Sequence, residues 1–307
     1  MNKCFAAVAV LVTAFNLAVS GPSPEIHLTG IPDSTPHCYK MTTNVTHIEP
    51  NGQRKTWEVY TVWLELTPKA EGDRVTCRRF TFREGEAPEV AIPSLQDWSY
   101  RLPKTAFDDR GQLFGIEQAK FERLLDEKGK VIPQGDAYMV FNAFVDFHSF
   151  CHVFAARTNS GMGIQDLHQI GDKIVHAAAN GEAPVSMGSM VEKGSTFKNG
   201  EITLELKGSS TIKGESCAIV GYDSGNSSLH MILKPMPQMK VETYGGSHYW
   251  GDIFINLNTQ WVQKATLAEL VVSETAVPGM PTKLHSVIER WIVLESISSD
   301  QCAAELK

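Results

Sequence analysis

The sequence predicts an α+β protein that is mainly antiparallel β, with long meander strands and a helical middle segment packed on the sheet. Three observations predict this class. Apolar and polar residues alternate with strand periodicity on both sides of a central region, where the apolar spacing changes to three and four residues. Turn signals separate the strand-like segments at regular intervals. Since hydrophobic residues make up 42% of the 307 residues, the chain can form a packed core.

Residues 1–20 have the layout of a secretory signal peptide. Lys3 precedes an apolar run that starts at Phe5, and the small residues Ala18 and Ser20 stand at the −3 and −1 positions of a cleavage site. We therefore expect export to a periplasmic or extracellular location, with cleavage after Ser20. An uncleaved anchor is the alternative, but the apolar run is shorter than the roughly 20 residues that a membrane span needs. We expect no transmembrane segment in the mature chain.

The charge pattern limits the classes of partner. The formal net charge is −7, and no run of Lys and Arg stands out beyond the pair Arg78 and Arg79. Proteins that bind nucleic acid or anionic membranes by electrostatics carry a basic patch. We therefore expect no nucleic-acid partner.

Residues 21–93 are predicted to form an N-terminal β region after a proline-rich lead-in. Tyr39, Met41, Thr43 and Val45 alternate on one face of a first strand. Residues 57–66 and 75–82 are rich in aromatic and β-branched side chains, which favour strands.

The middle segment, residues 94–185, is predicted to be helical. The pattern favours helices over residues 117–127, 138–156 and 164–179. The second of these contains apolar residues at helical spacing and places Asn142, Asp146 and Ser149 on the opposite side. A strand over the same residues is the alternative, because Phe144, Asp146 and His148 also share one parity.

Residues 186–307 are predicted to form a C-terminal antiparallel β region. Ile202, Leu204 and Leu206 alternate, and two long final strands are expected over 262–272 and 284–294. The paired glycines Gly245 and Gly246 are expected to bend the chain between two strands. The region joins the earlier strands in one sheet or forms a separate β unit.

The segment DFHSFCH, residues 146–152, raises the question of a metal site. On a helix His148 and His152 share one face and can bind zinc, with His168 or His176 as further ligands. However, no Glu follows the first His, as the zinc-protease motif requires. We favour a helix that packs its His, Cys and Phe side chains against a sheet, and we expect no cofactor. A metal-dependent hydrolase that uses His148, His152, His168 and His176 remains the alternative.

The aromatic and glycine-rich segment 244–252 is the candidate ligand-binding site. Tyr244, His248, Tyr249 and Trp250 interleave with glycines, which allow a ligand to approach the backbone, and Tyr and Trp offer amphipathic surface. A bent hairpin whose rings cover one end of a sheet is the alternative. The chain has no Gly-x-Ser-x-Gly elbow and no glycine-rich phosphate loop.

The strands between Glu201 and Glu295 resemble the curved β half-barrels of periplasmic lipoprotein-carrier-type proteins. The resemblance lies in Tyr249-x-Gly-Asp, Asn256-x-Asn-Thr259 and Val262-x-x-Ala265, within the C-terminal third of the chain. It implies a concave face that holds acyl chains. The middle segment of almost 90 residues departs from the shorter helices of that family.

These observations favour an exported, non-catalytic protein that binds an apolar, amphiphilic or lipid-like ligand or a partner in the cell envelope. A structural cell-surface module is a further alternative. Five cysteines follow the leader, an odd number that leaves at least one thiol free or paired with another chain.

Overall fold

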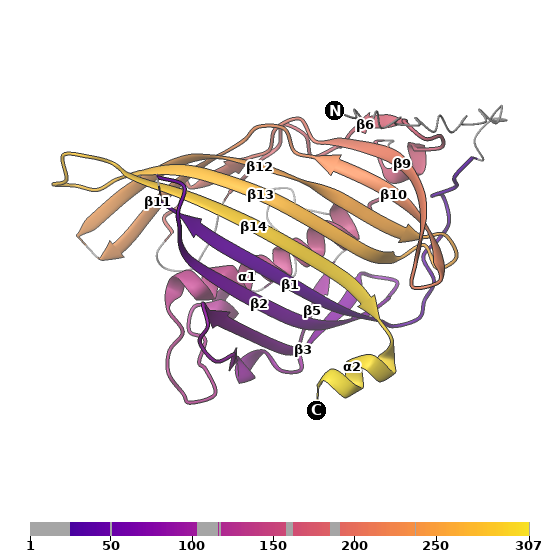
Figure 1. Cartoon of the computed structure of the whole chain (residues 1–307), viewed down its shortest axis with the longest axis horizontal. Helices are drawn as coiled ribbons and strands as arrows, with labels where there is room; N and C mark the ends of the chain where they lie inside the picture. The colour runs from indigo at the N-terminus through magenta and orange to yellow at the C-terminus, as the bar shows by residue number, and fades with distance from the viewer. Residues whose placement is uncertain are drawn as a thin grey trace, which may run out of the picture.

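The computed structural model describes residues 25–49, 51–102, 116, 118–157, 162–184, 191–236 and 238–306. The described strands form one large antiparallel sheet (Figure 1) in the order β4-β3-β2-β1-β14-β13-β12-β10-β9-β6, with β5, β7, β8 and β11 attached to it. The strand bounds are β1 His37–Ile48, β2 Arg54–Thr67, β3 Asp73–Glu84, β4 Val90–Ala91, β5 Trp98–Leu102, β6 Lys173–Val175, β7 Glu182–Pro184, β8 Thr196–Lys198, β9 Thr203–Ile212, β10 Glu215–Asp223, β11 Ser227–Met236, β12 Met239–Asn256, β13 Val262–Ala276 and β14 Leu284–Ile297.

Pairing of the first and last strands unites the two predicted β regions. β1 runs antiparallel to β14 over eleven residue pairs, from Cys38 with Ile297 to Ile48 with Val287. The strands near both ends of the chain therefore belong to one sheet, and the mainly antiparallel β class is confirmed.

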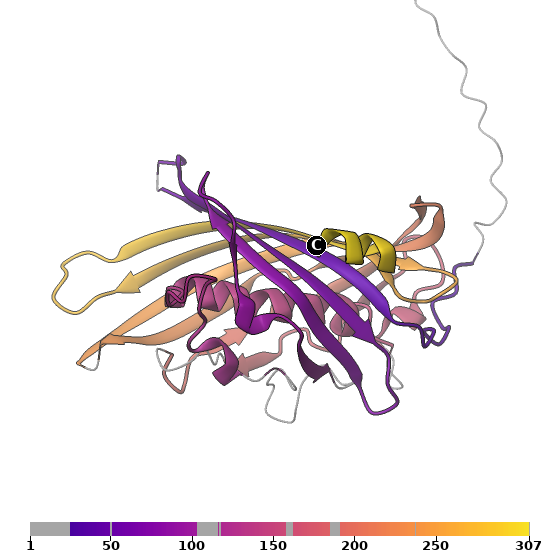
Figure 2. The same cartoon turned by 90° about the horizontal axis from the view of Figure 1, so that it is seen from below.

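One long helix lies on the inner face of the sheet. Helix α1 spans Gln134–His148 and continues into a π-helical turn, η3, over Ser149–Val153. Figure 2 shows the sheet arching over this helix. The apolar side of α1 enters the core, where Phe144 stacks on Phe80 and Phe147 contacts Tyr39 edge-on. The predicted helix over 138–156 is confirmed, starting four residues earlier.

The other two predicted helices are wrong. Within 117–127 only a 3₁₀ turn forms, η2 Gln118–Phe121, and Leu125 bridges to Val131. Within 164–179 a 3₁₀ turn, η4 Ile164–Asp166, is followed by strand β6. In both segments the apolar residues at helical spacing are buried, although the chain there forms only single 3₁₀ turns and irregular backbone. The buried residues are Phe121, Leu124, Ile164 and Leu167.

Strand β12 also differs from the prediction, because it passes through Gly245 and Gly246 without a break. Both glycines pair with β11 and with β13. A Cβ atom on Gly245 would lie 2.7 Å from the carbonyl oxygen of Val272, so the glycine permits close approach of the neighbouring strand rather than a bend.

Asp146 is buried, contrary to its predicted place on the polar side of the helix. Its carboxylate accepts a hydrogen bond from Arg290 on β14, and Arg290 also donates to Glu269 on β13. The sequence predicts that the Asp146 carboxylate faces solvent, because the pattern around it does not reveal its partner. That partner, Arg290, stands 144 positions later in the chain. The ion group fastens α1 to the sheet.

A short helix, α2 Ser299–Glu305, closes the described chain, and η1 Pro93–Leu95 precedes β5. The predicted leader and its cleavage site lie outside the described residues. Over the part of the chain that is described, no helix combines the length and apolar character that crossing a bilayer requires.

Candidate functional site

A cavity of about 370 Å³ opens at the C-terminal end of η3. Four segments contribute to its lining: residues 31–34 of the extended N-terminal segment, residues 68–70 between β2 and β3 together with Asp73 at the start of β3, residues within 151–157, and Trp261. Its lining combines apolar side chains with charged ones: Ile31, Pro32, Pro68 and Trp261 on the one hand, and Asp33, Lys69, Asp73 and Arg157 on the other. We call this cavity the η3 pocket.

A histidine–aspartate pair forms one buried wall of the η3 pocket. His152 donates through Nε2 to Oδ2 of Asp73 at 2.8 Å, and the backbone N–H of Lys69 donates to Oδ1 of Asp73 at 3.1 Å. His152 and Asp73 are 9% and 4% exposed. Nδ1 of His152 is buried and has no hydrogen-bond partner among the described residues. A polar atom is thus left beside the cavity, able to bond a ligand or a water.

The π-helical turn explains how this histidine reaches the pocket. A π turn is wider than an α turn and commonly occurs at functional sites. Here it buries four successive side chains, Phe150, Cys151, His152 and Val153, so that apolar and polar groups of one short segment all face protein. The same turn stacks the rings of His148 and His152 with their centroids 5.5 Å apart.

Arg157 supplies positive charge without a carboxylate partner in the described structure. Its Nε donates to the carbonyl of Leu28 at 2.7 Å, and its Nη2 donates to Oε1 of Gln260 at 2.8 Å. Burial lowers the pKa of Arg157 to about 10, which leaves it protonated at neutral pH. Lys69 lines the same pocket and also has no ion-pair partner among these residues. A partly buried cation with only neutral acceptors attracts an anion.

Cys151 borders the same pocket, but its chemistry does not suit a nucleophile. Burial raises the pKa of the Cys151 thiol, and the negative charge of Asp73 raises it further. The thiol therefore stays protonated, whereas a catalytic cysteine needs a lowered pKa. His152 bonds Asp73, and no hydrogen bond from Cys151 to His152 forms.

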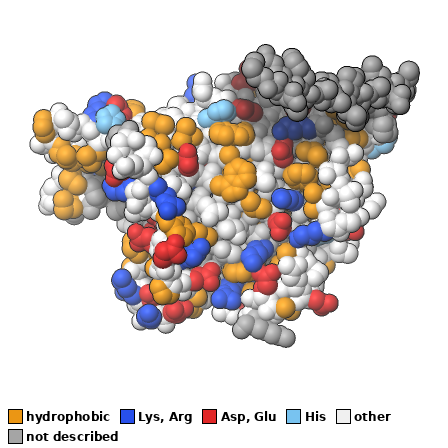
Figure 3. Space-filling model, in the orientation of Figure 1, with side chains coloured by type: hydrophobic (Ala, Val, Ile, Leu, Met, Phe, Trp, Pro, Cys, Tyr) orange, Lys and Arg blue, Asp and Glu red, His pale blue; other side chains and the backbone are white. Residues whose placement is uncertain are grey.

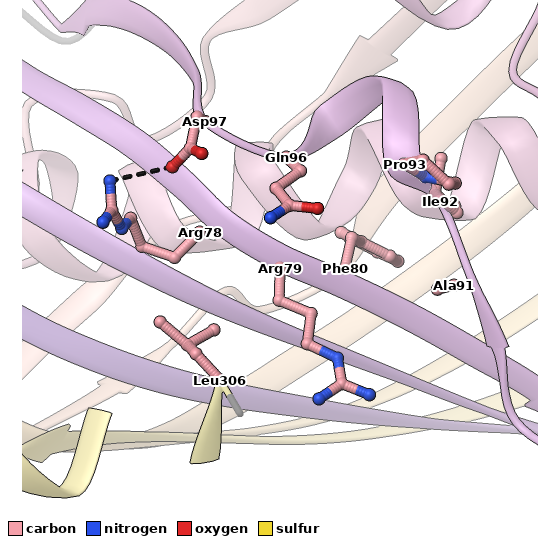
Figure 4. Close-up of a pocket in the computed structure, with 9 residues that line it drawn as sticks. All are labelled: Arg78, Arg79, Phe80, Ala91, Ile92, Pro93, Gln96, Asp97 and Leu306. Atoms are coloured by element: carbon pink, nitrogen blue, oxygen red, sulfur yellow. Dashed lines mark ion pairs between the residues drawn. The ribbon is translucent and has the colours of Figure 1, made fainter. Parts of the chain in front are cut away.

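A second cavity, of about 420 Å³, lies between β3, η1 and the end of α2 (Figure 4). Arg78 and Arg79 line it together with Leu306. Here Nη1 of Arg78 is paired with Asp97 at 2.8 Å, and Arg79 stacks over Trp63 and donates to the carbonyl of Glu305. Arg78 is already neutralised and therefore serves as the comparison cation for Arg157, whereas Arg79 beside it has only neutral partners among the described residues.

The structure places the four predicted ligand-binding residues on two faces of β12. Tyr244, His248 and Trp250 project from the outer face, where Tyr244 stacks on His230 and His248 donates to Asp223 at 2.9 Å. Tyr249 projects inward and donates to Asn199. The four therefore do not line one rim.

Exposed apolar side chains lie on the outer face of β12, β13 and β14, and we call this group the outer patch. Figure 3 shows hydrophobic side chains on the face of the sheet that is turned to the viewer. Trp250 and Trp291 flank Ala268 in one cross-strand row, and Leu270 and Val272 continue the patch along β13. These two tryptophans are 43% and 50% exposed.

The four histidines of the metal hypothesis have separate environments. His148 and His152 are neighbours, whereas Nε2 of His176 donates to the carbonyl of Val153, and His168 is half-exposed beside Glu25. Among the described residues no group of three or more His, Cys, Asp or Glu side chains is arranged to hold a metal ion.

Sequence reasoning missed Asp73, Arg157 and Trp261 as site residues. Asp73 precedes the predicted strand over 75–82, and Arg157 follows the predicted helix over 138–156. The sequence around each residue shows no partner for it. The available signal in the sequence was that His152 and Arg157, two side chains that can carry positive charge, stand close together at the end of the aromatic helix.

Comparison with known proteins assigns no family. No family model matches the chain, and no curated protein matches its sequence. Among solved structures, a DUF1329 family protein from Desulfovibrio piger aligns at 8% identity over 88% of this chain and 91% of that chain, with a TM-score of 0.15. A multiply substituted mutant of Rh. blastica porin aligns at 10% identity over 86% of this chain and 99% of that one, with a TM-score of 0.18. Likenesses at these scores carry no argument about fold or function.

Proposed function

We propose that this protein is an exported, non-catalytic binding protein whose η3 pocket takes a small amphiphile with an anionic head group. The observation that carries the proposal is Arg157, a partly buried guanidinium with no carboxylate partner in the described structure, in the wall of a cavity that apolar side chains also line. The head group, a carboxylate or a phosphate, pairs with Arg157 and Lys69. The apolar tail lies along Pro32, Pro68 and Trp261.

The size of the pocket supports a small ligand. Its volume of about 370 Å³ is near the lower end of the roughly 300–1,000 Å³ of ordinary ligand sites. The concave face of the sheet itself is filled by α1 and η3, whose Phe144, Phe147 and Phe150 are fully buried. A long acyl chain along that face would have to displace the helix, so the proposal confines the ligand to the end of η3.

Recovery of the natural ligand tests this function. The full chain is purified from its own cells without detergent, and native mass spectrometry compares its mass with that after denaturation. Bound small molecules are then extracted and identified. The proposal expects an organic acid or phosphate with an alkyl or aryl tail. A neutral or cationic ligand, or an absence of ligand together with no binding of octanoate or octyl phosphate, would overturn it.

A second candidate is contact between the outer patch and a partner in the cell envelope. The exposed Trp250, Trp291 and Val272 favour it, because large exposed apolar patches mark interaction sites. Crosslinking in cells distinguishes the two sites. A crosslinker placed at Trp291 should capture a partner that one placed at Lys234 on β11 does not, and equal yields at both positions would count against a role for the patch.

A further inference from the structure

The C-terminal helix brings two cysteines together from opposite ends of the chain. Cys38 lies on β1 with its side chain on the outer face, and Cys302 lies on the inner side of α2. They share a small buried cluster with Trp63 and Ile297, separate from the main core. The two cysteines are 8% and 4% exposed.

Polar contacts fix α2 in this position. Glu305 accepts hydrogen bonds from Nζ of Lys40 at 2.6 Å and from Nε1 of Trp63 at 3.0 Å. At the other end, the hydroxyl of Ser298 accepts a hydrogen bond from the backbone N–H of Gln301 and caps the helix. With these contacts at both ends, α2 buries Cys302 in the cluster that also contains Cys38.

The two thiols are buried in the same small cluster. Burial raises the pKa of Cys302 to about 11, and the adjacent Cys38 thiol contributes to the rise. The remaining cysteines have other surroundings. Cys77 and Cys151 are enclosed in the main core, and Cys217 donates to the carbonyl of Glu215 at 3.6 Å.

We propose that Cys38 and Cys302 form a disulfide bond in the mature protein. The oxidant is a low-molecular-weight or protein disulfide. One cysteine, as its thiolate, attacks this disulfide and forms a mixed disulfide. The second thiolate then attacks the cysteine sulfur of the mixed disulfide and displaces the remaining sulfur of the oxidant. One Sγ–Sγ bond forms, and the two protons of the cysteine thiols end on the two thiols to which the oxidant is reduced. The inference rests on the proposed function in one respect: export would bring the protein to a compartment that supplies the oxidant.

Access for the oxidant comes through local opening of α2. A helix of seven residues that packs on the sheet through a small cluster opens more readily than the core strands do. Once closed, the bond is buried under the helix and is shielded from reductants. It would fasten the helix that supplies Leu306 to the wall of the second cavity (Figure 4).

Peptide mapping of the full chain tests the proposal. The reduced protein is incubated with oxidised glutathione, alkylated after denaturation and digested without reductant. We expect a linked peptide containing Cys38 and Cys302, and alkylation of Cys77, Cys151 and Cys217. The intact mass should fall by two hydrogen atoms. Cys38→Ser and Cys302→Ser should each abolish the linked peptide, whereas Cys217→Ser should retain it.

Two outcomes would overturn the disulfide. One is alkylation of both Cys38 and Cys302 in the oxidised wild-type chain, and the other is a linked peptide that joins either residue to a different cysteine. The wild-type map needs no variant, so a variant that fails to fold does not weaken the test. Because octanoate binding is measured separately on reduced and oxidised samples, failure of the disulfide and failure of the pocket are distinguishable.

Discussion

Nε2 of His152 lies 2.8 Å from Oδ2 of Asp73, and both side chains are buried. The pair joins the π turn of the central helix to the first residue of β3, 79 positions earlier in the chain. It therefore shapes the η3 pocket as well as stabilising the contact between helix and sheet.

Removal of the Asp73 carboxylate should destabilise the protein. Asp73→Ala leaves Nε2 of His152 and the N–H of Lys69 without their acceptor, and an unsatisfied buried donor costs about 1–3 kcal/mol. Urea unfolding measures the loss. As a control, Asp97→Asn breaks the exposed pair with Arg78 and should change stability by less than about 1 kcal/mol. Equal losses for both variants would contradict a structural role for the buried pair.

Asp146 should make folding stability fall as the pH rises from about 4 to about 6. Burial raises the pKa of Asp146 to about 6. The guanidinium of Arg290 lowers this pKa and offsets part of the rise, but it is shared with Glu269, whose negative charge raises the pKa again. A raised carboxyl pKa favours the folded state below the unfolded pKa of about 3.9, and this stabilisation disappears as the folded group ionises. The difference should be on the order of 3 kcal/mol, at about 1.4 kcal/mol per unit.

Comparison with Asp146→Asn isolates that effect. The free energy of unfolding is measured by urea titration across this pH range for both proteins. Their difference should change steadily between about pH 4 and pH 6 and stay constant above it. A difference that does not vary with pH would show that Asp146 keeps an ordinary pKa.

The aromatic contact between α1 and the sheet should dominate the stability of the helix. Phe144 is fully buried and its ring lies against Phe80, Trp98 and Tyr100. Phe144→Ala should cost about 3–5 kcal/mol. Phe141→Ala, on the partly exposed side of the same helix, should cost clearly less. Thermal or urea unfolding measures both losses. A larger loss of stability for Phe141→Ala than for Phe144→Ala would contradict the side of α1 that packs against the sheet in this structure.

Much of the sheet could be predicted from the sequence, because strand alternation is a local property. The final strands, predicted over 262–272 and 284–294, form as β13 and β14 with extended ends. The predicted helix at 164–179 failed because Ile174 pairs with Leu204 on β9, a contact that a local pattern cannot show. Helix α2 was missed, although Ser298-x-x-Gln301 is a capping signal.

The candidate site was harder to predict because it depends on contacts between distant residues. His152 was singled out for its metal-binding chemistry, but its partner Asp73 is on another element. The cation that motivates the proposed ligand, Arg157, is singled out because it forms no ion pair in the described structure, and a sequence does not reveal that. The ligand prediction at Tyr244, His248, Tyr249 and Trp250 rested on residue types alone, and the pleat of β12 separates them.

Titration of three ligands with equal tails tests the central claim most directly. Octyl phosphate, octanol and octyltrimethylammonium are titrated by calorimetry into wild-type protein, Arg157→Met and the control Arg78→Met from the second cavity. We expect octyl phosphate to bind the wild type at least about tenfold more tightly than the other two, a difference of about 1.4 kcal/mol. Arg157→Met should lose this preference and Arg78→Met should keep it. Equal affinity for all three ligands, or a preference for the anion that survives Arg157→Met, would contradict the account.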